Sequence, residues 1–380
     1  MKTSLTLETL TDLSDIEPLV CDWERLAGQD ASEGFFRSPA WYLSWLRRIR
    51  PDVTPLVLVV RERHRVVAVA PLCSRKRGLS LRSVTLAGND LVCGEYLDFP
   101  SLSEYRHAAM EHIWERLASQ QVNWDLLVLN AIPCEGDLFW EARKRAQDHG
   151  WMLRSDQRFC PFIELPSTFG DYLARFSKRR RKHLARAMRI FREEGSEFKT
   201  YKTQQELEAM LPHLIELHTL RWQRRGKTGT LGKAGFREFL QDLARQKSDG
   251  SLQLHTLELE GIPRAAMLNF HFGESVFQFQ NGFDPNWSLA RHSPGTVLLL
   301  HAIKAAVEER RRFYDFLRGT EEYKFQFADR SRLISTLYLA RTFRAKLYLA
   351  SQDLRGFMAA LKPGARDRAA AAGELVFLPR

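Results

Sequence analysis

Two stretches of the sequence, one in each half of the chain, follow the same order of strand-like and helix-like segments. In the second half, β-branched and apolar runs at 252–259, 265–271 and 276–281 are separated by short turns. A helical pattern, SPGTVLLLHAIKAAVEERR, and a further apolar run, FYDFLRG, follow them. The first half has the same order in PLVLVVRERHRVVAVAPLC, SEYRHAAMEHIWERLASQ and WDLLVLN, roughly 190 residues earlier. This recurrence predicts an α/β protein that repeats one mixed α/β unit in tandem.

The length of 380 residues also favours more than one domain. We expect an N-terminal half at residues 1–155, a C-terminal domain at 156–345 and a helical tail at 346–380. A basic helix at 170–195 is expected within the C-terminal domain. Its apolar residues Leu184, Met188 and Phe191 recur at helical spacing, and Gly195 is placed to end it.

The charge balance favours an anionic partner. The chain has 57 Lys and Arg against 46 Asp and Glu, a formal charge of +11. Phosphates of a cofactor, nucleic acid, an anionic polymer and an anionic membrane surface all fit this charge. Part of it is concentrated in the expected basic helix, at Arg179, Arg180, Lys182, Arg186 and Arg189. Either a solvated helix face or a surface that binds an anion explains this density.

Several common functional patterns are missing from the sequence. Five cysteines are present, Cys21, Cys73, Cys93, Cys134 and Cys160. Their number is odd and none are spaced as CxxC, so we expect reduced, mostly buried thiols. His213 and His218 do not share a helical face, and no metal site is expected. The first residues lack the apolar core of a signal peptide, and no run reaches the roughly 18 apolar residues of a membrane span. We therefore expect a cytoplasmic protein, with peripheral membrane contact left open.

The loop before the second-half helix has the features of a phosphate-binding helix start. Ser293 is a good N-cap, Pro294 suits the first helical position, and Gly295 and Thr296 keep the first turn small. Backbone N–H groups at such a start can bind a phosphate or pyrophosphate, and the neighbouring Arg291 and His292 strengthen this interpretation. A well-capped helix without a ligand explains the same residues.

The apolar run after that helix contains a carboxylate. Phe313, Asp315 and Leu317 share one face of the expected strand. A buried carboxylate without a partner is costly, so Asp315 should either face a cleft or pair with a cation such as Arg318.

These segments together resemble a known family. The strand order, SPGTVLLLHAIKAAVEE and YDFLRGTEEYKFQFA are similar to the acetyltransferase-type domain of the CelD and BioF2-like proteins, a branch of the GNAT (GCN5-related N-acetyltransferase) superfamily. That branch is related to the Fem aminoacyl transferases, which carry two GNAT-like halves. The matching residues are Ser293, Pro294, Gly295, Asp315, Arg318, Gly319, Tyr323 and Lys324, with Ser177, Lys178 and Arg181 upstream. The resemblance covers about residues 159–341 and the first half only by architecture.

The resemblance implies the acyl-CoA N-acyltransferase fold, with two tandem GNAT-like domains of which the second is catalytic. It implies transfer of an acyl group, in the simplest case from acetyl-CoA, to an amine or hydroxyl of a small molecule or saccharide, in exopolysaccharide or cell-envelope synthesis. RHSPGT is only a loose counterpart of the pyrophosphate loop of standard GNAT enzymes. An aminoacyl-tRNA donor, as in the Fem relatives, therefore stays open, as does a non-catalytic binding protein of the same fold.

Acyl transfer assigns hypothetical roles to the matching residues. Asp315 would be the base or orient the acceptor, with His292 as the alternative base, and Tyr323 would protonate the leaving thiolate. The groups expected to bind the donor are the N–H groups of residues 293–296 and the side chains of Arg291, Arg318 and Lys324, of which Arg318 and Lys324 could instead bind an anionic acceptor.

Overall fold

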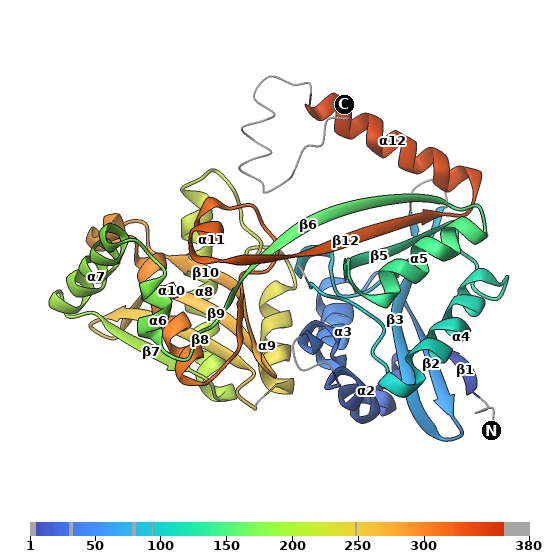
Figure 1. The fold of residues 1–380 in the computed structure, drawn as a ribbon, viewed down its shortest axis with the longest axis horizontal. Helices are drawn as coiled ribbons and strands as arrows, with labels where there is room; N and C mark the ends of the chain where they lie inside the picture. The colour runs from blue at the N-terminus through green and yellow to red at the C-terminus, as the bar shows by residue number, and fades with distance from the viewer. Residues whose placement is uncertain (1–4, 30–32, 78–80, 93, 248, 361–380) are drawn as a thin grey trace. The chain divides into compact units, whose positions relative to one another are not determined.

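The computed structural model describes residues 5–360 except 30–32, 78–80, 93 and 248 (Figure 1). The chain forms two compact units. Unit 1 comprises residues 1–46, 50–161 and 318–380, and unit 2 comprises residues 47–49 and 162–317. Among the described residues, no helix is long and apolar enough to cross a membrane.

Unit 1 is built on a mixed sheet with the strand order β1-β2-β3-β4-β5-β12-β6. The strands are β1 (Leu5–Leu10), β2 (Thr54–Glu62), β3 (Arg65–Arg77), β4 (Leu81–Leu86), β5 (Leu126–Pro133), β6 (Met152–Glu164) and β12 (Arg330–Ala340). β1 to β4 pair as antiparallel neighbours, whereas β4 and β5 are parallel. The last strand, β12, pairs with β5 in antiparallel register, with Leu337 opposite Leu129.

The helices of unit 1 are α1 (Leu13–Ile16), α2 (Val20–Ala27), α3 (Pro39–Ser44), α4 (Arg106–Ala118), α5 (Asp137–Asp148), α11 (Glu322–Phe327) and α12 (Phe343–Ala360). Of these, α2, α4, α5 and α12 contact strands of this sheet. Trp23 of α2 and Trp114 of α4 are fully buried. α12 packs Ala345 and Leu349 against residues of β4 and β5.

The strands of unit 2 follow the order β6-β11-β10-β9-β8-β7, to which β6 contributes its last residues. The strands are β7 (Glu197–Tyr201), β8 (Leu252–Leu259), β9 (Ile262–Phe272), β10 (Ser275–Phe283) and β11 (Phe313–Asp315). β7 to β10 are antiparallel neighbours, and β10 and β11 are parallel. β11 is antiparallel to β6, with Tyr314 opposite Ile163.

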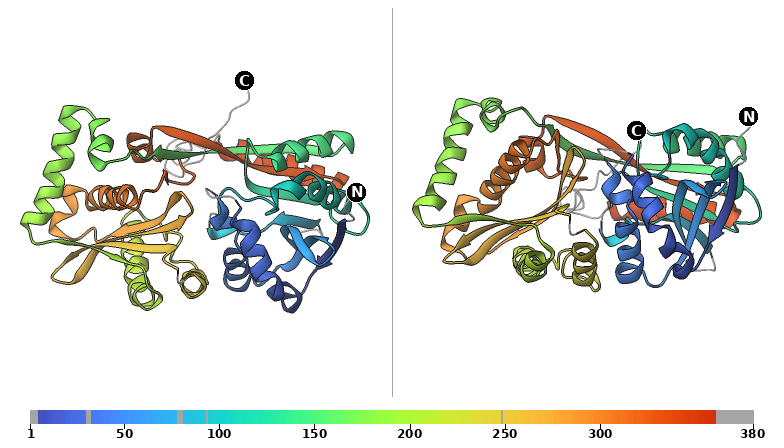
Figure 2. Two further views of the ribbon diagram at one scale, coloured as in Figure 1. Left: turned by 60° about the horizontal axis from the view of Figure 1, so that its bottom comes forward. Right: turned by 90° about the horizontal axis from the view of Figure 1, so that it is seen from below.

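The helices of unit 2 lie on both faces of its sheet. They are α6 (Phe169–Ala174), α7 (Lys178–Glu193), α8 (Gln204–Gln223), α9 (Phe236–Gln246) and α10 (Pro294–Glu308), with a short 3-10 helix, η7 (Ser288–His292), before α10. Figure 2 shows α10 on one face and α8 and α9 on the other, where α8 contacts β9 and β10.

The predicted repeat is confirmed by the strand pairing. In unit 1 the antiparallel strands β2, β3 and β4 are followed by α4 and then by β5, which is parallel to β4. In unit 2 the antiparallel strands β8, β9 and β10 are followed by α10 and then by β11, which is parallel to β10. The two halves therefore contain the same tandem α/β arrangement that the sequence predicts.

The limits of the units differ from the expected domains at 1–155 and 156–345. Unit 2 ends at Leu317, and the chain from Arg318 onward returns to unit 1. The reason is the pairing of β12 with β5, which places the last strand in the sheet of the first half. The expected tail at 346–380 begins inside α12, and its residues 361–380 lie outside the described residues.

The expected basic helix at 170–195 is two helices, because Ser177 starts a new one. The Ser177 side chain accepts a hydrogen bond from the Arg180 N–H and caps α7. Gly195 follows the end of α7 with φ = 76°, a conformation that glycine adopts without strain. The predicted end of the helix is therefore confirmed.

The cysteines that the structure describes are free thiols. Cys73 and Cys160 are buried, Cys134 is half-buried and Cys21 is exposed. Burial raises the pKa of Cys73 to about 12, so this thiol stays protonated at neutral pH. Cys93 lies outside the described residues.

Candidate functional site

The pairing of the parallel strands β10 and β11 is short. Three pairs join them, and the last is Phe277 with Asp315. β11 then ends, whereas β10 continues to Phe283 with a register shift against β9 between Gln278 and Gln280. Since α10 connects the carboxyl end of β10 to β11, the helix begins at the edge of the sheet where this pairing ends. Ligands of open α/β sheets bind at such edges.

The first turn of α10 leaves a backbone donor exposed at this edge. Ser293 occupies the predicted N-cap position with φ = 62°, but its side chain makes no capping hydrogen bond. The N–H groups of Thr296 and Val297 donate to the Ser293 carbonyl oxygen. For the Gly295 N–H, the described residues provide no hydrogen-bond acceptor, and a Cβ at Gly295 would meet nothing within 4 Å. The helix start is therefore open to an anion.

Two further predicted residues lie directly before this turn, in η7. Arg291 is exposed and His292 is half-buried. Arg291 Nε donates to His292 Nε2 at 3.1 Å. A guanidinium and an imidazole thus stand beside the open helix start.

Asp315 ends β11 and is completely buried. Its Oδ1 accepts a hydrogen bond from the Leu317 N–H at 2.7 Å. Leu317 has φ = 56°, a left-handed conformation that costs energy for a residue with a branched side chain. The carboxylate therefore stabilises a strained turn at the end of β11, which gives it a structural role in addition to any chemical one.

Arg318, predicted as a partner of Asp315 or of a phosphate, pairs with a different carboxylate. Its Nε lies 2.9 Å from Glu95 Oε1 within unit 1, and Glu95 is fully buried. The sequence did not single out Glu95, although it stands in an apolar stretch, GEYLDF, just as Asp315 stands in FYDFL.

Lys324 also has partners inside unit 1. Its Nζ donates to the Arg318 carbonyl oxygen at 2.6 Å and lies 3.1 Å from Glu321 Oε2. These contacts surround Gly319, whose φ of 146° requires glycine. The partners favour a structural role for Lys324 in the turn that leads into α11, where the half-buried Tyr323 lies.

The predicted site residues therefore divide between the units. Asp315 and the η7–α10 turn, with Arg291, His292, Ser293, Gly295 and Thr296, belong to unit 2. Arg318, Tyr323 and Lys324 belong to unit 1.

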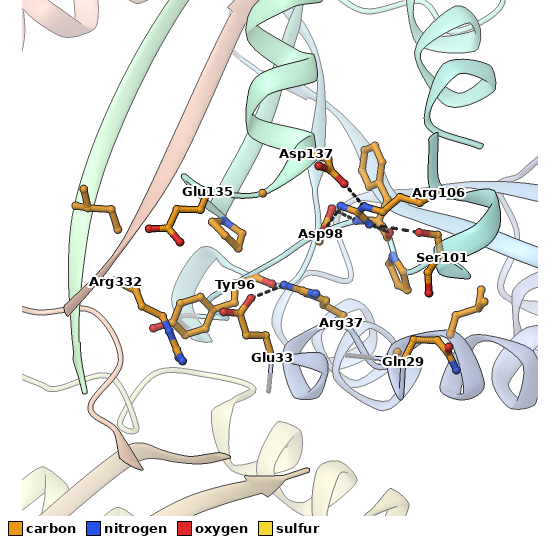
Figure 3. Close-up of a pocket in the computed structure, with 18 residues that line it drawn as sticks. Gln29, Glu33, Arg37, Tyr96, Asp98, Ser101, Arg106, Glu135, Asp137 and Arg332 are labelled. Carbon is orange, nitrogen blue, oxygen red and sulfur yellow. Dashed lines mark hydrogen bonds and ion pairs between the residues drawn. The ribbon is translucent and has the colours of Figure 1, made fainter. Parts of the chain in front are cut away.

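A cavity of about 560 Å³ in unit 1 was not predicted (Figure 3). Arg37 and Arg106 are fixed in its wall. Arg37 donates to the Tyr96 carbonyl oxygen at 2.6 Å and pairs with Glu33 at 2.7 Å. Arg106 pairs with Asp98 at 2.7 Å and with Asp137 at 2.6 Å. No single sequence pattern joins these residues, because they come from segments far apart in the chain.

A group of buried polar side chains under α10 was also missed. His271 Nδ1 of β9 lies 3.1 Å from Glu309 Oε2, and the ring centroids of His255 and His301 are 5.7 Å apart. Burial lowers the pKa of His271, although its hydrogen bond to Glu309 opposes the shift. Burial, with the nearby His301, holds the pKa of His255 well below its usual range. These imidazoles are therefore neutral at neutral pH.

A family model described as an acetyltransferase (GNAT) domain matches residues 178–325. This segment is a GNAT domain. It contains α7, β8 to β10, η7, α10 and β11, so the open helix start and Asp315 lie within it. The predicted resemblance is thereby confirmed for residues 178–325.

Solved structures with the same fold cover nearly the whole chain. FemX matches with a TM-score of 0.60 and 11% identity, over 90% of this chain and 99% of FemX. A C-terminal domain of a putative lysylphosphatidylglycerol synthetase from Agrobacterium fabrum matches with a TM-score of 0.55 and 11% identity, over 89% of this chain and 96% of that domain. None of the curated protein sequences matches this chain. At such identities the likeness concerns the fold, which extends over both halves around the GNAT domain.

Proposed function

We propose that the GNAT domain binds acyl-CoA at the edge where β10, β11 and α10 meet, and that it transfers the acyl group to an amine or hydroxyl. Acetyl-CoA is the simplest donor. The observation that carries this proposal is the open start of α10, where the Gly295 N–H has no acceptor among the described residues. A pyrophosphate at this position would accept from that N–H and gain from the helix dipole. Arg291, in the preceding η7, adds a positive charge.

The acyl transfer requires two proton transfers, one from the acceptor and one to the leaving thiolate. The acceptor nitrogen or oxygen attacks the thioester carbonyl carbon, the C–S bond breaks, and the acyl group stays on the acceptor. The acceptor loses a proton to a base, and the CoA thiolate takes one up from an acid. In unit 2, Asp315 and His292 are the proposed bases, because both lie in segments at the edge where the pairing of β10 and β11 ends.

Asp315 is the preferred base because of the family resemblance and its place at the end of β11. Its position at the last β10–β11 pair is fixed by the strand and by the Leu317 N–H, whereas His292 lies in a short helix near the surface. A fixed position favours proton transfer, which needs a short, well-aligned contact. Tyr323, which lies in unit 1, is predicted as the acid by the family resemblance alone. The proposed acceptor is a small molecule or saccharide, in exopolysaccharide or cell-envelope synthesis.

Calorimetric titration with CoA and acetyl-CoA tests the donor. We expect saturable binding at micromolar concentration that Gly295→Asp weakens at least tenfold, because a carboxylate at the helix start repels the pyrophosphate. The added side chain has room, so the variant should fold. Gly136→Asp is the matched control, since Gly136 is the N-cap of α5 in unit 1 with φ = −80°.

Absence of binding to the wild-type protein at moderate salt would refute the acyl-CoA donor and favour a charged tRNA donor or a non-catalytic protein. Equal weakening by Gly295→Asp and Gly136→Asp would place the CoA site elsewhere.

A further inference from the structure

The positive charge of the protein is concentrated on α7. This helix contains eight Lys and Arg and one Glu in 16 residues, a formal charge of +7. The whole chain of 380 residues has a formal charge of +11. The rest of the chain is therefore close to balanced, and solubility does not explain why the charge is gathered on one helix.

The two sides of α7 differ sharply in chemistry. Leu184, Ala187 and Phe191 are buried, and Phe191 packs against Trp287 of the segment before η7 with ring centroids 5.2 Å apart. On the outward side, Lys178, Lys182 and Arg186 recur every fourth residue. At 1.5 Å per residue these cations are about 6 Å apart along a helix of about 24 Å. They form a continuous positive stripe along α7, the helix labelled in Figure 1.

Within the part of the chain that the structure describes, the three cations of this stripe have no internal partner. Among the described residues, no ion pair or hydrogen bond engages the side chains of the exposed residues Lys178, Arg179, Lys182, Arg186 and Arg192. Arg189 pairs with Glu193 at 3.6 Å, but both side chains are about two-thirds exposed, so the pair is weak. Like charges one turn apart destabilise a helix by roughly 0.2–0.5 kcal/mol per pair. The repulsion within the stripe thus destabilises α7, and binding of a polyanion would relieve it.

The stripe fits a phosphodiester backbone better than a membrane. Helices that insert into a membrane surface expose large apolar side chains beside their cations. In α7 none of the large apolar side chains is exposed. Regularly spaced cations without apolar neighbours match regularly spaced phosphates, whose neutralisation releases counterions.

We propose that the outward face of α7 binds the phosphodiester backbone of a nucleic acid. This binding does not depend on the identity of the acyl donor, because it uses different side chains.

Fluorescence anisotropy with labelled 25-nucleotide oligomers tests the proposal. The probes are single-stranded RNA, single-stranded DNA, hairpin RNA and duplex DNA, which share the backbone and differ in shape and sugar. The full chain should bind, with an affinity that falls linearly on a log–log plot as salt rises. The triple variant Lys178→Gln, Lys182→Gln, Arg186→Gln should bind roughly tenfold or more weakly at 50 mM salt, and its salt slope on single strands should be smaller by about 2.

A second triple variant, Lys144→Gln, Lys233→Gln, Arg237→Gln, removes the same charge from other exposed positions and should bind like the wild type. Circular dichroism establishes that both variants are folded. The proposal is overturned if no oligomer binds at 50 mM salt or if both triple variants lose affinity equally. The proposal is also overturned if the oligomers do not bind, whereas vesicles with phosphatidylglycerol bind the wild-type protein and bind the α7 triple variant more weakly.

Discussion

Arg318 Nε lies 2.9 Å from the fully buried carboxylate of Glu95, whereas the Arg318 side chain is 29% exposed. Removing the guanidinium should therefore lower the stability of the protein more than removing the carboxylate. Arg318→Met would leave a carboxylate inside the protein without its guanidinium, and we expect the free energy of unfolding to fall by about 3 kcal/mol. Glu95→Gln leaves the guanidinium partly in water and should cost about half as much. Urea unfolding of the two variants measures the difference.

An exposed pair provides the comparison for this prediction. Lys304 and Glu308 form an ion pair on the surface of α10, with side chains 46% and 61% exposed. Lys304→Ala should therefore leave the unfolding midpoint almost unchanged. If Arg318→Met behaves like Lys304→Ala, the Glu95–Arg318 pair contributes nothing to stability and Arg318 becomes available again as a ligand-binding residue.

The backbone conformation at Gly319 and its close neighbours should make any substitution there destabilising. Its φ of 146° disfavours any other residue, and a Cβ would collide with the Glu321 carboxylate and the Lys324 ammonium. We expect Gly319→Ala to destabilise unit 1 by about 2 kcal/mol. Gly170→Ala in α6 is the control, because a Cβ there meets only Thr168 Oγ1 at 3.6 Å. That variant should be neutral or slightly stabilising, and a neutral Gly319→Ala would show that the turn can relax.

The comparison of sequence and structure shows which features depend on local chemistry. Residues 252–259 were expected as a strand, and β8 has these bounds, because alternating apolar residues and flanking turns act within a few residues. Gly195 likewise ends α7 as expected. These predictions needed no knowledge of distant segments.

Features that depend on distant segments were missed. The pairing of β12 with β5 and the ion pair of Arg318 with Glu95 join parts of the chain far apart in sequence. The sequence predicted that Arg318 binds an anion, but it did not distinguish between the Asp315 carboxylate, another carboxylate and a phosphate of the donor. Local patterns therefore indicated which residues are unusual, whereas the sheet topology decided their partners.

The stability of unit 2 should fall on mild acidification. Burial, with help from Arg221, lowers the pKa of His218 to about 4. Between pH 6.5 and 4 the unfolded chain binds a proton at this residue and the folded chain does not, so unfolding becomes more favourable as pH falls. Protonation of His218 in the unfolded chain should by itself lower the free energy of unfolding by about 2 kcal/mol between pH 7 and pH 5. The buried His255, His271 and His301, whose pKa values are also lowered, act in the same direction.

His218→Gln isolates this contribution. The glutamine can still accept from Trp222 Nε1, which donates to His218 Nε2 at 2.9 Å in the structure. Urea unfolding at pH 7 and pH 5 should show a smaller loss for this variant than for the wild type. His107→Gln, at a histidine side chain that is 83% exposed, should leave the pH dependence unchanged. Identical pH dependence in His218→Gln and the wild type would contradict the assignment.

Substitution of Asp315 can separate its structural and chemical roles. Asp315→Asn keeps an oxygen that accepts from the Leu317 N–H, so the turn at the end of β11 should survive and binding of CoA should persist. If Asp315 is the base, CoA release from acetyl-CoA with an amine acceptor should slow by about 10²–10⁴-fold. Asp315→Ala removes the acceptor as well and should also lower the unfolding midpoint. A folded Asp315→Asn variant with full turnover would exclude Asp315 as the base and leave His292, for which His292→Gln is then the decisive variant.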